Sequence, residues 1–171
     1  FRLPTGISIG RNGYLYVLDA QNNRIQKFSS EGQFISKWGV FGSAEGQFSF
    51  PRGGIALDLN SNVYLSDDYN HRIQKFDSNG QFVTKWGPGD SNGEFIDISG
   101  IASDSEGNIY VADLGAERVQ KFSPAGNFLG KWGSVGHEDG QFFYGPVSIA
   151  VNSIGDVYAV DGWGFRVQRF T

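Results

Sequence analysis

The stretch YLSDDYNHRIQKF, from Tyr64 to Phe76, decides the fold because its pattern occurs four times in the chain. In each copy a Tyr is followed three positions later by an Asp, five positions after that by an Arg, and then by Gln and Phe. The other copies are YVLDAQNNRIQKF, YVADLGAERVQKF and YAVDGWGFRVQRF, which begin at Tyr16, Tyr110 and Tyr158. Their Asp residues lie 48, 46 and 48 positions apart. A repeat of this length with strand-like sequence indicates the blades of a β-propeller.

The sequence of each complete repeat predicts four short strands. In the second copy, an apolar run at 54–58 is followed by a turn signal, and residues 63–67 alternate between apolar and polar. Residues 72–76 and 81–86 form two more strand-like segments with a Gly-containing turn between them. Four strands joined by tight turns make an antiparallel meander, and no window has useful helical periodicity. We therefore predict an all-β propeller of four-stranded antiparallel blades.

The last repeat is shorter than the others. We predict one propeller segment over residues 1–171, with blades at about 3–50, 51–97 and 98–144 and a partial blade at 145–171. Six blades of this length would need about 280 residues. The sequence therefore favours an incomplete propeller, as a fragment or as a chain completed by another copy, over a four-bladed ring. Unpaired edge strands of such a segment are prone to associate.

The connections between strands are of two kinds. Those between the first and second and between the third and fourth strands are tight and carry turn glycines such as Gly13 and Gly126. The connections between the second and third strands, and between blades, are longer and more variable. Successive connections in a meander alternate between its two ends, so both variable sets share one face. We expect ligand binding on this variable face, because functional residues concentrate on loops held by a rigid scaffold.

Composition argues against several classes of function. The chain has no Cys, which excludes disulfides and thiolate chemistry, and no apolar run approaches the roughly 20 residues of a membrane span. No signal peptide is visible. The net charge is −4, and of 14 basic residues only Arg2, Arg11 and Arg52 lie outside recurring positions, which disfavours nucleic-acid binding. The content of Asn, Ser, Gly and Gln favours an extracellular or exported protein.

The recurring phrase resembles the NHL repeat. The resemblance is clearest at Asn70 to Phe76, with Asp67 before it and Gly80-Gln81-Phe82 after it, and again at 23–28. The linking phrase Lys-Trp-Gly occurs at 37–39, 85–87 and 131–133. The resemblance covers essentially the whole chain and implies a propeller, usually of six blades. Such propellers occur in tripartite-motif regulators that bind RNA or protein, in sensor-kinase ectodomains and in an amidating lyase, so the resemblance implies a habit of binding and no single activity.

One Asp and one Arg recur together in every repeat. A loop of four residues brings the end of one strand beside the start of the next, so each pair can form a charge-assisted hydrogen bond within its blade. Because the pair occurs once per blade, we interpret it as structural and not as a catalytic acid with its electrophile. The predicted pairs are Asp19/Arg24, Asp67/Arg72, Asp113/Arg118 and Asp161/Arg166.

The two histidines, His71 and His137, both fall in variable connections, with Asp68 and Glu138 beside them. A zinc site needs three or four ligands, and the amidating lyases that the repeat resembles depend on several histidines. We therefore expect no metal site and no cofactor. Neither a nucleophile elbow nor a phosphate loop is present, and we name no catalytic residue. The acidic segment 90–94 is interpreted as a solvated turn, because it lacks the ligand spacing of a calcium loop.

Aromatic residues at variable positions are the candidates for ligand contact. Tyr69, Trp163 and Phe165 lie between second and third strands, where the other repeats carry polar or small residues. Exposed aromatics often anchor an interface. The alternatives are that they pack on a neighbouring loop or cover the open edge. The predicted binding residues are Tyr69, His71, Glu117, Trp163, Phe165 and Arg52.

These observations predict a non-enzymatic binding or scaffold module that contacts a protein or a glycan through its variable face. One alternative is a structural repeat whose open edge strands, at residues 166–171 for example, join copies into a ring or fibre. Another is a fragment of a six-bladed propeller lyase or hydrolase. RNA binding is disfavoured by the acidic balance, and its signature would be a steep loss of affinity with salt.

Overall fold

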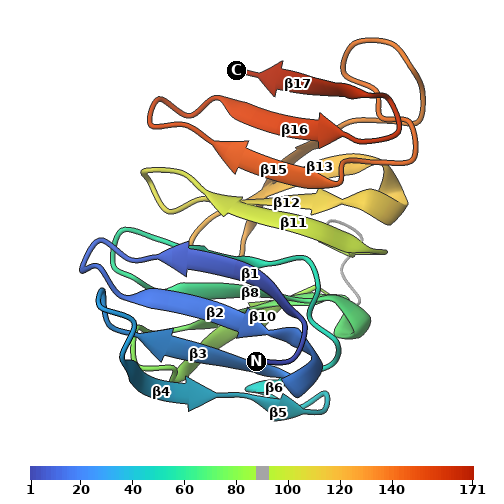
Figure 1. Cartoon of the computed structure of the whole chain (residues 1–171). Coiled ribbons are helices and arrows are strands. Elements are labelled where there is room, and N and C mark those ends of the chain that lie inside the picture. Colours follow the sequence, from blue (N-terminus) through green and yellow to red (C-terminus); the bar gives the residue numbers. More distant parts are fainter. Residues whose placement is uncertain (88–92) are drawn as a thin grey trace.

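The computed structural model describes residues 1–87 and 93–171, so part of the acidic segment 90–94 lies outside the described residues. The chain is built almost entirely of short antiparallel strands in four successive sheets (Figure 1). Three sheets have four strands each, in the orders β1-β2-β3-β4, β7-β8-β9-β10 and β11-β12-β13-β14, and the last has three, β15-β16-β17. The predicted all-β propeller of four-stranded blades is confirmed.

The strand bounds follow the repeat. The first sheet contains β1 (Pro4–Ile9), β2 (Leu15–Asp19), β3 (Arg24–Phe28) and β4 (Phe34–Trp38). The second contains β7 (Ile55–Leu57), β8 (Val63–Asp67), β9 (Arg72–Phe76) and β10 (Phe82–Trp86). The third contains β11 (Ile98–Ser103), β12 (Ile109–Asp113), β13 (Arg118–Phe122) and β14 (Phe128–Trp132). The fourth contains β15 (Ser148–Val151), β16 (Val157–Asp161) and β17 (Arg166–Phe170).

Two kinds of local structure occur in connections where plain loops were expected. Three connections between second and third strands close as 3-10 turns, η1 (Ala20–Asn22), η2 (Asp68–Asn70) and η3 (Leu114–Ala116). Each ends in a left-handed residue whose N–H donates to the carbonyl of the first residue of the turn, which closes a four-residue loop without leaving that N–H unpaired. In addition, β5 (Val40–Phe41) and β6 (Gln47–Phe48) form a short parallel pair in the first connection between sheets.

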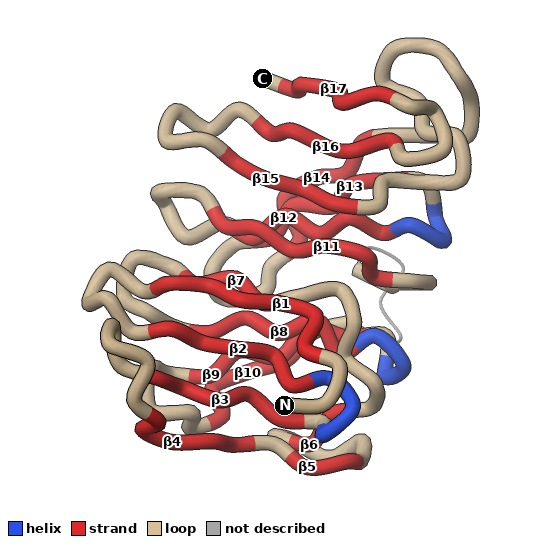
Figure 2. The backbone as a smooth tube through the Cα atoms, in the orientation of Figure 1, coloured by secondary structure: helices blue, strands red, loops and turns tan. Residues whose placement is uncertain are grey.

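The sheets are arranged around one axis, with β1, β7, β11 and β15 innermost and each packed beside the next (Figures 1 and 2). Aromatic side chains fill the space between neighbouring sheets. The tryptophan that ends each fourth strand packs on the phenylalanine that ends the third strand of the next sheet, with ring centroids 5.8–6.2 Å apart, in the pairs Trp38–Phe76, Trp86–Phe122 and Trp132–Phe170. This aromatic contact recurs at each of the three junctions between sheets.

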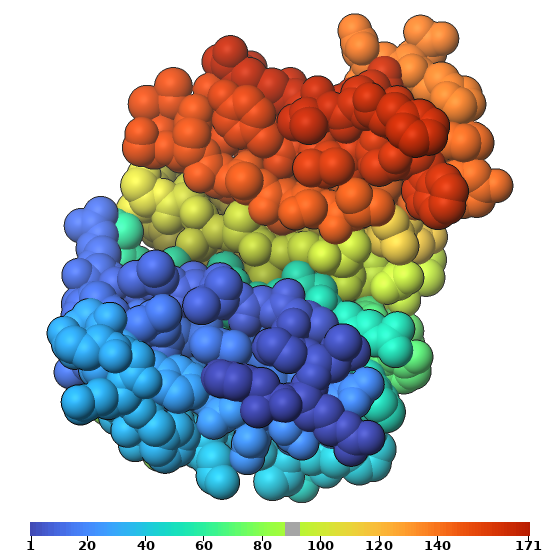
Figure 3. Space-filling model, in the orientation of Figure 1, coloured from blue at the N-terminus to red at the C-terminus, as the bar shows by residue number. Residues whose placement is uncertain are grey.

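The outward faces of the first and last sheets are uncovered. Ile7 on β1 is 62% exposed, whereas its counterparts in the later sheets are buried: Ile55, Ile101 and Ile149. Val167 on β17 is 63% exposed, whereas its counterparts in the earlier sheets are fully buried: Ile25, Ile73 and Val119. Figure 3 shows the first sheet (blue) and the last (red) at opposite ends of the visible surface, with residues of the third sheet (yellow) between them. The four sheets therefore form an arc with two open end faces.

Candidate functional site

The variable face is built by a hydrogen-bonded unit that centres on the recurring aspartate. In the second sheet Asp67 is fully buried at the end of β8. Its Oδ2 accepts hydrogen bonds from Arg72 Nε at 2.8 Å, Asn70 Nδ2 at 2.9 Å and Gln74 Nε2 at 3.0 Å. Its Oδ1 accepts the backbone N–H of Ser49 at 2.8 Å. One carboxylate thus fixes the loop after β8 and the chain segment that leads into the second sheet.

The same unit also holds the long connection between sheets. The guanidinium of Arg72 donates to the carbonyls of Ser43 at 2.7 Å, Ala44 at 2.8 Å and Gln47 at 2.9 Å. Gln74 Nε2 donates to the Gln47 carbonyl as well, at 2.7 Å. Backbone carbonyls of an irregular loop that would otherwise face water or go unpaired are therefore satisfied by framework side chains. The variable connection is anchored on this face.

The three other repeats contain the corresponding ion pair, at 2.8 Å for Asp19–Arg24, 3.0 Å for Asp113–Arg118 and 3.1 Å for Asp161–Arg166. Burial alone would raise the pKa of Asp19, but hydrogen bonds from the Arg2 amide, Asn22 and Arg24 outweigh it and hold that pKa below its usual range. All four carboxylates are fully buried and hydrogen-bonded inside the blades, so they position the loops and do not reach the surface where a ligand would lie.

A first aromatic cluster lies on the variable face and consists of Phe41, Phe50 and Tyr69 with Arg52. The rings of Phe41 and Phe50 are 6.1 Å apart, those of Phe50 and Tyr69 are 5.3 Å apart, and the Arg52 guanidinium lies 5.6 Å from the Tyr69 ring centroid. All three rings remain exposed: Phe41 65%, Phe50 41% and Tyr69 56%. Large aromatic side chains that contact one another and still face solvent are unusual on a surface that has no partner.

A second aromatic cluster, at the junction of the third and fourth sheets, consists of His137, Phe143, Tyr144 and Trp163. Successive ring centroids lie 4.3 Å apart from His137 to Phe143, 4.7 Å from Phe143 to Tyr144 and 5.9 Å from Tyr144 to Trp163. Tyr144 and Trp163 are 63% and 60% exposed. Both clusters lie on connections that run along the same side of the sheets, to the right in Figure 2.

Three of the predicted binding residues occupy one equivalent backbone position. His71, Glu117 and Phe165 each precede a third strand and have positive φ angles of 51°, 47° and 54°. In the first repeat the same position is Asn23, whose side-chain oxygen accepts the backbone N–H of Phe50 at 3.0 Å. His71 is exposed, Glu117 is half-buried and Phe165 is 92% exposed. The chain therefore presents a different side chain at this fixed point in each repeat.

Sequence reasoning missed two members of each cluster: Phe41 and Phe50 in the first, and Phe143 and Tyr144 in the second. Phe50 and Tyr144 come just before an inner strand, where an apolar residue reads as the start of the core. Both have positive φ angles, 44° and 62°, which turn the side chain outward. Their position in a variable connection, two residues after the recurring Phe48 or Phe142, is the sequence feature that could have identified them as surface residues.

The two histidines lie in different connections and do not form one site. His137 stacks on Phe143, and His71 stands beside Asp68, whose Oδ1 accepts the backbone N–H of Ile98 at 2.9 Å. Burial raises the pKa of Asp68, in keeping with a structural acceptor between two sheets. Within residues 1–87 and 93–171, no group of three or more His, Cys, Asp or Glu residues is placed to hold a metal ion. In the same residues no helix is long and apolar enough to cross a membrane.

Comparison with known families supports the sequence assignment. The family model described as NHL repeat matches residues 1–28 and 95–122. These segments fall in the first and third repeats of the same periodic pattern. No curated protein matches the chain.

Many solved structures share the fold. A catalytically inactive variant of virginiamycin B lyase from Staphylococcus aureus, solved with quinupristin, is 18% identical with a TM-score of 0.72; the match covers 98% of this chain and 52% of the lyase. A protein of unknown function from Bacteroides thetaiotaomicron is 16% identical with a TM-score of 0.75, covering 97% and 46%. Hydrazine synthase of Kuenenia stuttgartiensis is 12% identical with a TM-score of 0.69, covering 98% and 49%. The chain thus spans about half the length of these structures, and the likeness shows the fold alone.

Proposed function

We propose that this propeller-type chain, two segments of which match the NHL repeat model, is a non-catalytic binding module whose variable face contacts a protein or glycan ligand. The observation that carries this proposal is the pair of exposed aromatic clusters, around Tyr69 and around Trp163. Tyr and Trp combine a large apolar area with few rotatable bonds, so they are over-represented among residues that dominate binding energy.

The way the clusters are held supports the same function. Phe50, Tyr144 and Phe165 have a left-handed backbone, which costs free energy for bulky residues and persists only where the surroundings impose it. The buried aspartates bond to the loops that carry these rings, through the amides of Ser49, Phe143 and Gly164, each of which directly precedes one of the three residues. A surface fixed before it meets its ligand loses less conformational entropy on binding. This arrangement is expected of a binding face.

Polar groups border the aromatic surface and would give it selectivity. Arg52 lies against Tyr69, His71 follows the same loop, and Glu117 lies between the two clusters in chain order. A central apolar patch with a charged rim is typical of a protein-binding surface. Stacking of sugar rings on Tyr69 or Trp163 is the corresponding mode for a glycan. An extracellular or exported location suits either ligand and stays part of the proposal.

The experiment that tests the proposal selects ligands without assuming their identity. The chain is screened against a phage-displayed peptide library and a glycan array, and each binder is measured again with two single variants, Tyr69→Ala and Trp163→Ala. We expect at least one variant to weaken binding about tenfold or more, equivalent to about 1.4 kcal/mol. The matched control is Ile154→Ala, which removes an 80% exposed apolar side chain from the opposite, tight-turn end of the fourth sheet. Binders affected only by the control, or no binders, would refute the proposal.

A second candidate function is favoured by the fold comparison. The virginiamycin B lyase match covers nearly all of this chain and about half of that enzyme, which is the relation expected if these residues are part of a propeller lyase. The test is to incubate the chain, and any longer polypeptide that contains it, with quinupristin and follow the compound by mass spectrometry. Conversion of quinupristin would establish a lyase-type activity. If quinupristin stays intact and the selected ligands bind to the aromatic clusters, the binding function is retained and the lyase function is rejected.

A further inference from the structure

The first aromatic cluster is held between complete four-stranded sheets. On one side, the amide of Phe50 donates to the side-chain oxygen of Asn23 in the first repeat, at 3.0 Å. On the other side, the η2 turn that carries Tyr69 is joined to the third sheet, because the Ile98 amide donates to Asp68 at 2.9 Å. The rings of the cluster therefore remain exposed although the sheets on both sides of them are complete.

The charged member of this cluster is Arg52. Its side chain is exposed, and its guanidinium lies over the Tyr69 ring, 5.6 Å from the centroid. Within residues 1–87 and 93–171, no hydrogen bond or ion pair engages Arg52, so these residues leave its donors available to a ligand. A guanidinium presents its N–H groups as a planar fork that matches a carboxylate, and stacking on an aromatic ring orients that fork. This end of the cluster therefore suits an anionic group.

The three rings suit an apolar side chain better than a sugar. Phe41 and Phe50 meet edge to face, with 72° between their planes, and the planes of Phe50 and Tyr69 are tilted by 50°. Tyr69 also has the Arg52 guanidinium over its ring. A sugar stacks on a ring face that is open to water, whereas rings set at such angles present edges to an apolar side chain. The ring geometry thus favours a peptide ligand over a glycan.

The charges near the cluster limit how acidic the ligand can be. Asp97 in the third repeat is exposed at the position that Phe50 has in the second, and the net charge of the chain is −4. A polyanion such as a nucleic acid needs several cations together. In the second cluster the exposed charged residues of the connection are acidic, Glu138 and Asp139. One carboxylate beside an apolar group, bound at the first cluster, fits this distribution of charge.

We propose that the first cluster binds an extended peptide segment whose acidic side chain pairs with Arg52 and whose large apolar side chain, two positions away, packs on Phe41 and Phe50. Alternate side chains of an extended chain point to the same side and lie about 7 Å apart. Tyr69 lies 5.3 Å from Phe50 and 5.6 Å from the Arg52 guanidinium, so this spacing reaches both ends. The inference rests on the proposed function and deepens it, because it names a peptide ligand and the charge of its contact residue.

The probe is a synthetic peptide capped at both ends, acetyl-Gly-Ser-Glu-Ser-Trp-Ser-Glu-Ser-Gly-amide, whose symmetric order of side chains fits either chain direction. It is titrated into the 171-residue chain, and the resonances of Arg52 Nε–H and of the Tyr69 ring are followed by NMR. We expect both resonances to shift saturably. Two control peptides, one with Gln for both Glu residues and one with Ser for Trp, should each bind at least about fivefold more weakly.

Protein variants assign the charge contact to one side chain. Arg52→Gln should weaken the Glu peptide at least about fivefold and leave the weaker affinity for the Gln peptide unchanged. The matched control is Arg11→Gln, which removes an exposed arginine from the tight turn between β1 and β2, away from the variable face, and should change neither affinity. The urea midpoint of Arg52→Gln should equal that of the wild-type chain, because the exposed guanidinium bonds to none of the described residues.

Several results would overturn this inference. They are equal binding of the Glu and Gln peptides, no saturable binding at up to about 2 mM peptide, and tighter binding of tetragalacturonate or of a Gln peptide with a free C-terminal carboxylate. Ligands from the library screen separate the two proposals. If their affinity falls in Tyr69→Ala and not in Arg52→Gln, the binding function stands and the acidic peptide is rejected. If no selected ligand depends on Tyr69 or Trp163, the binding function itself is rejected.

Discussion

At the scale of single residues, the fully buried aspartate of each repeat does more than balance an arginine. Asp67 holds two separate chain segments, because its two oxygens bond to the loop after β8 and to the lead-in at Ser49. Its partner Arg72 is also almost completely buried, with 6% of the side chain exposed, whereas Arg166 in the last sheet is 27% exposed. Equivalent pairs therefore differ in how much water remains to replace a lost partner.

We predict that Asp67→Ala lowers the free energy of unfolding by about 3–5 kcal/mol, because removal of one partner leaves a buried, uncompensated charge. Asp161→Ala should cost less, about 1–2 kcal/mol, since water can reach Arg166. Urea denaturation of both variants measures the difference. Equal losses would mean that burial of the arginine does not control the contribution of the pair.

Stability should also depend on acid at Asp19, because its pKa is lowered in the folded chain. A carboxyl with a depressed folded pKa contributes stability that is complete above its unfolded pKa, about 3.9, and is lost as pH falls through the folded value. We therefore expect the difference in unfolding free energy between the wild-type chain and Asp19→Asn to be largest near neutral pH. It should shrink progressively below about pH 4. A difference that is constant from pH 7 to pH 2.5 would contradict this assignment.

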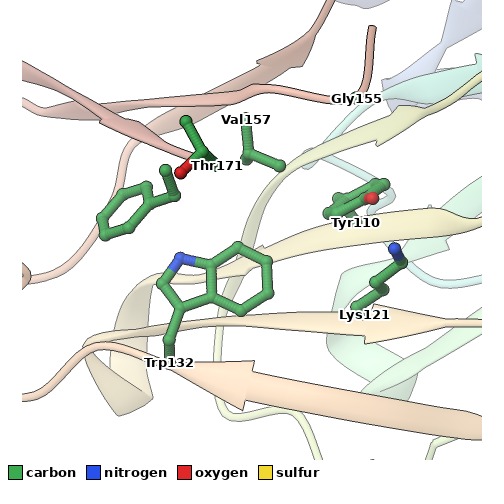
Figure 4. Close-up of a pocket in the computed structure, with 7 residues that line it drawn as sticks. Tyr110, Lys121, Trp132, Gly155, Val157 and Thr171 are labelled. Carbon is green, nitrogen blue, oxygen red and sulfur yellow. The ribbon is translucent and has the colours of Figure 1, made fainter.

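At the scale of the element, each of the first three sheets is stabilised by the next sheet, which covers one of its faces. Trp86 lies between Tyr64 and Phe122, with ring centroids 6.2 Å and 5.8 Å away, and is buried under the turn at Gly126. Trp132 has the same types of neighbour, Tyr110 and Phe170, but one side of it borders a hollow of about 430 Å³ that Gly155 and Thr171 also line (Figure 4). The tryptophan at this strand position should therefore contribute less to stability in the third sheet than in the second.

We predict that Trp86→Ala costs about 3–5 kcal/mol, the usual range for removal of a large buried aromatic side chain. Trp132→Ala should cost distinctly less, because part of the cavity it leaves is already open. Thermal and urea unfolding of the two variants, measured side by side, check the order. A larger loss for Trp132→Ala would show that the hollow beside Trp132 is not open in solution.

The strands could be predicted from sequence because their pattern occurs four times, so that noise in one copy is corrected by the others. The 3-10 turns and the outward lead-in rings could not. Phe50 and Tyr144 are apolar residues that lead into a strand, and each has a positive φ angle directly after a residue whose amide binds the recurring aspartate. Such a backbone turn cannot be seen in the residue types. Tyr69, Trp163 and Phe165 were identifiable because they depart from the repeat, whereas an apolar residue that is consistent with a strand gives no such signal.

At the scale of the whole molecule, the two end faces are related by the repeat. The face with Ile7 is the kind of surface that covers a preceding sheet, and the face with Val167 is the kind that covers a following one. They are complementary and not identical, so contact between copies through these faces would be head-to-tail and would lead to a closed ring or an open fibre.

We therefore predict that the mass measured by light scattering rises above 18.8 kDa as concentration increases. Ile7→Lys and Val167→Lys each place a charge on one end face at a side chain that is already exposed, so folding should be retained while association is lost. A substitution on the variable face, Tyr69→Ala, serves as the control and should leave association unchanged. A single mass of 18.8 kDa at all concentrations would rule out assembly through the end faces.

Ligand binding by the aromatic clusters on the variable face can be tested by one comparison of affinities. A peptide or glycan selected on the wild-type chain is titrated by calorimetry into the wild-type chain, the double variant Tyr69→Ala/Trp163→Ala and the control Ile154→Ala. We predict at least a tenfold loss of affinity in the double variant and no change in the control, with the same unfolding midpoint for all three chains. Equal affinity for the wild-type chain and the double variant would contradict it.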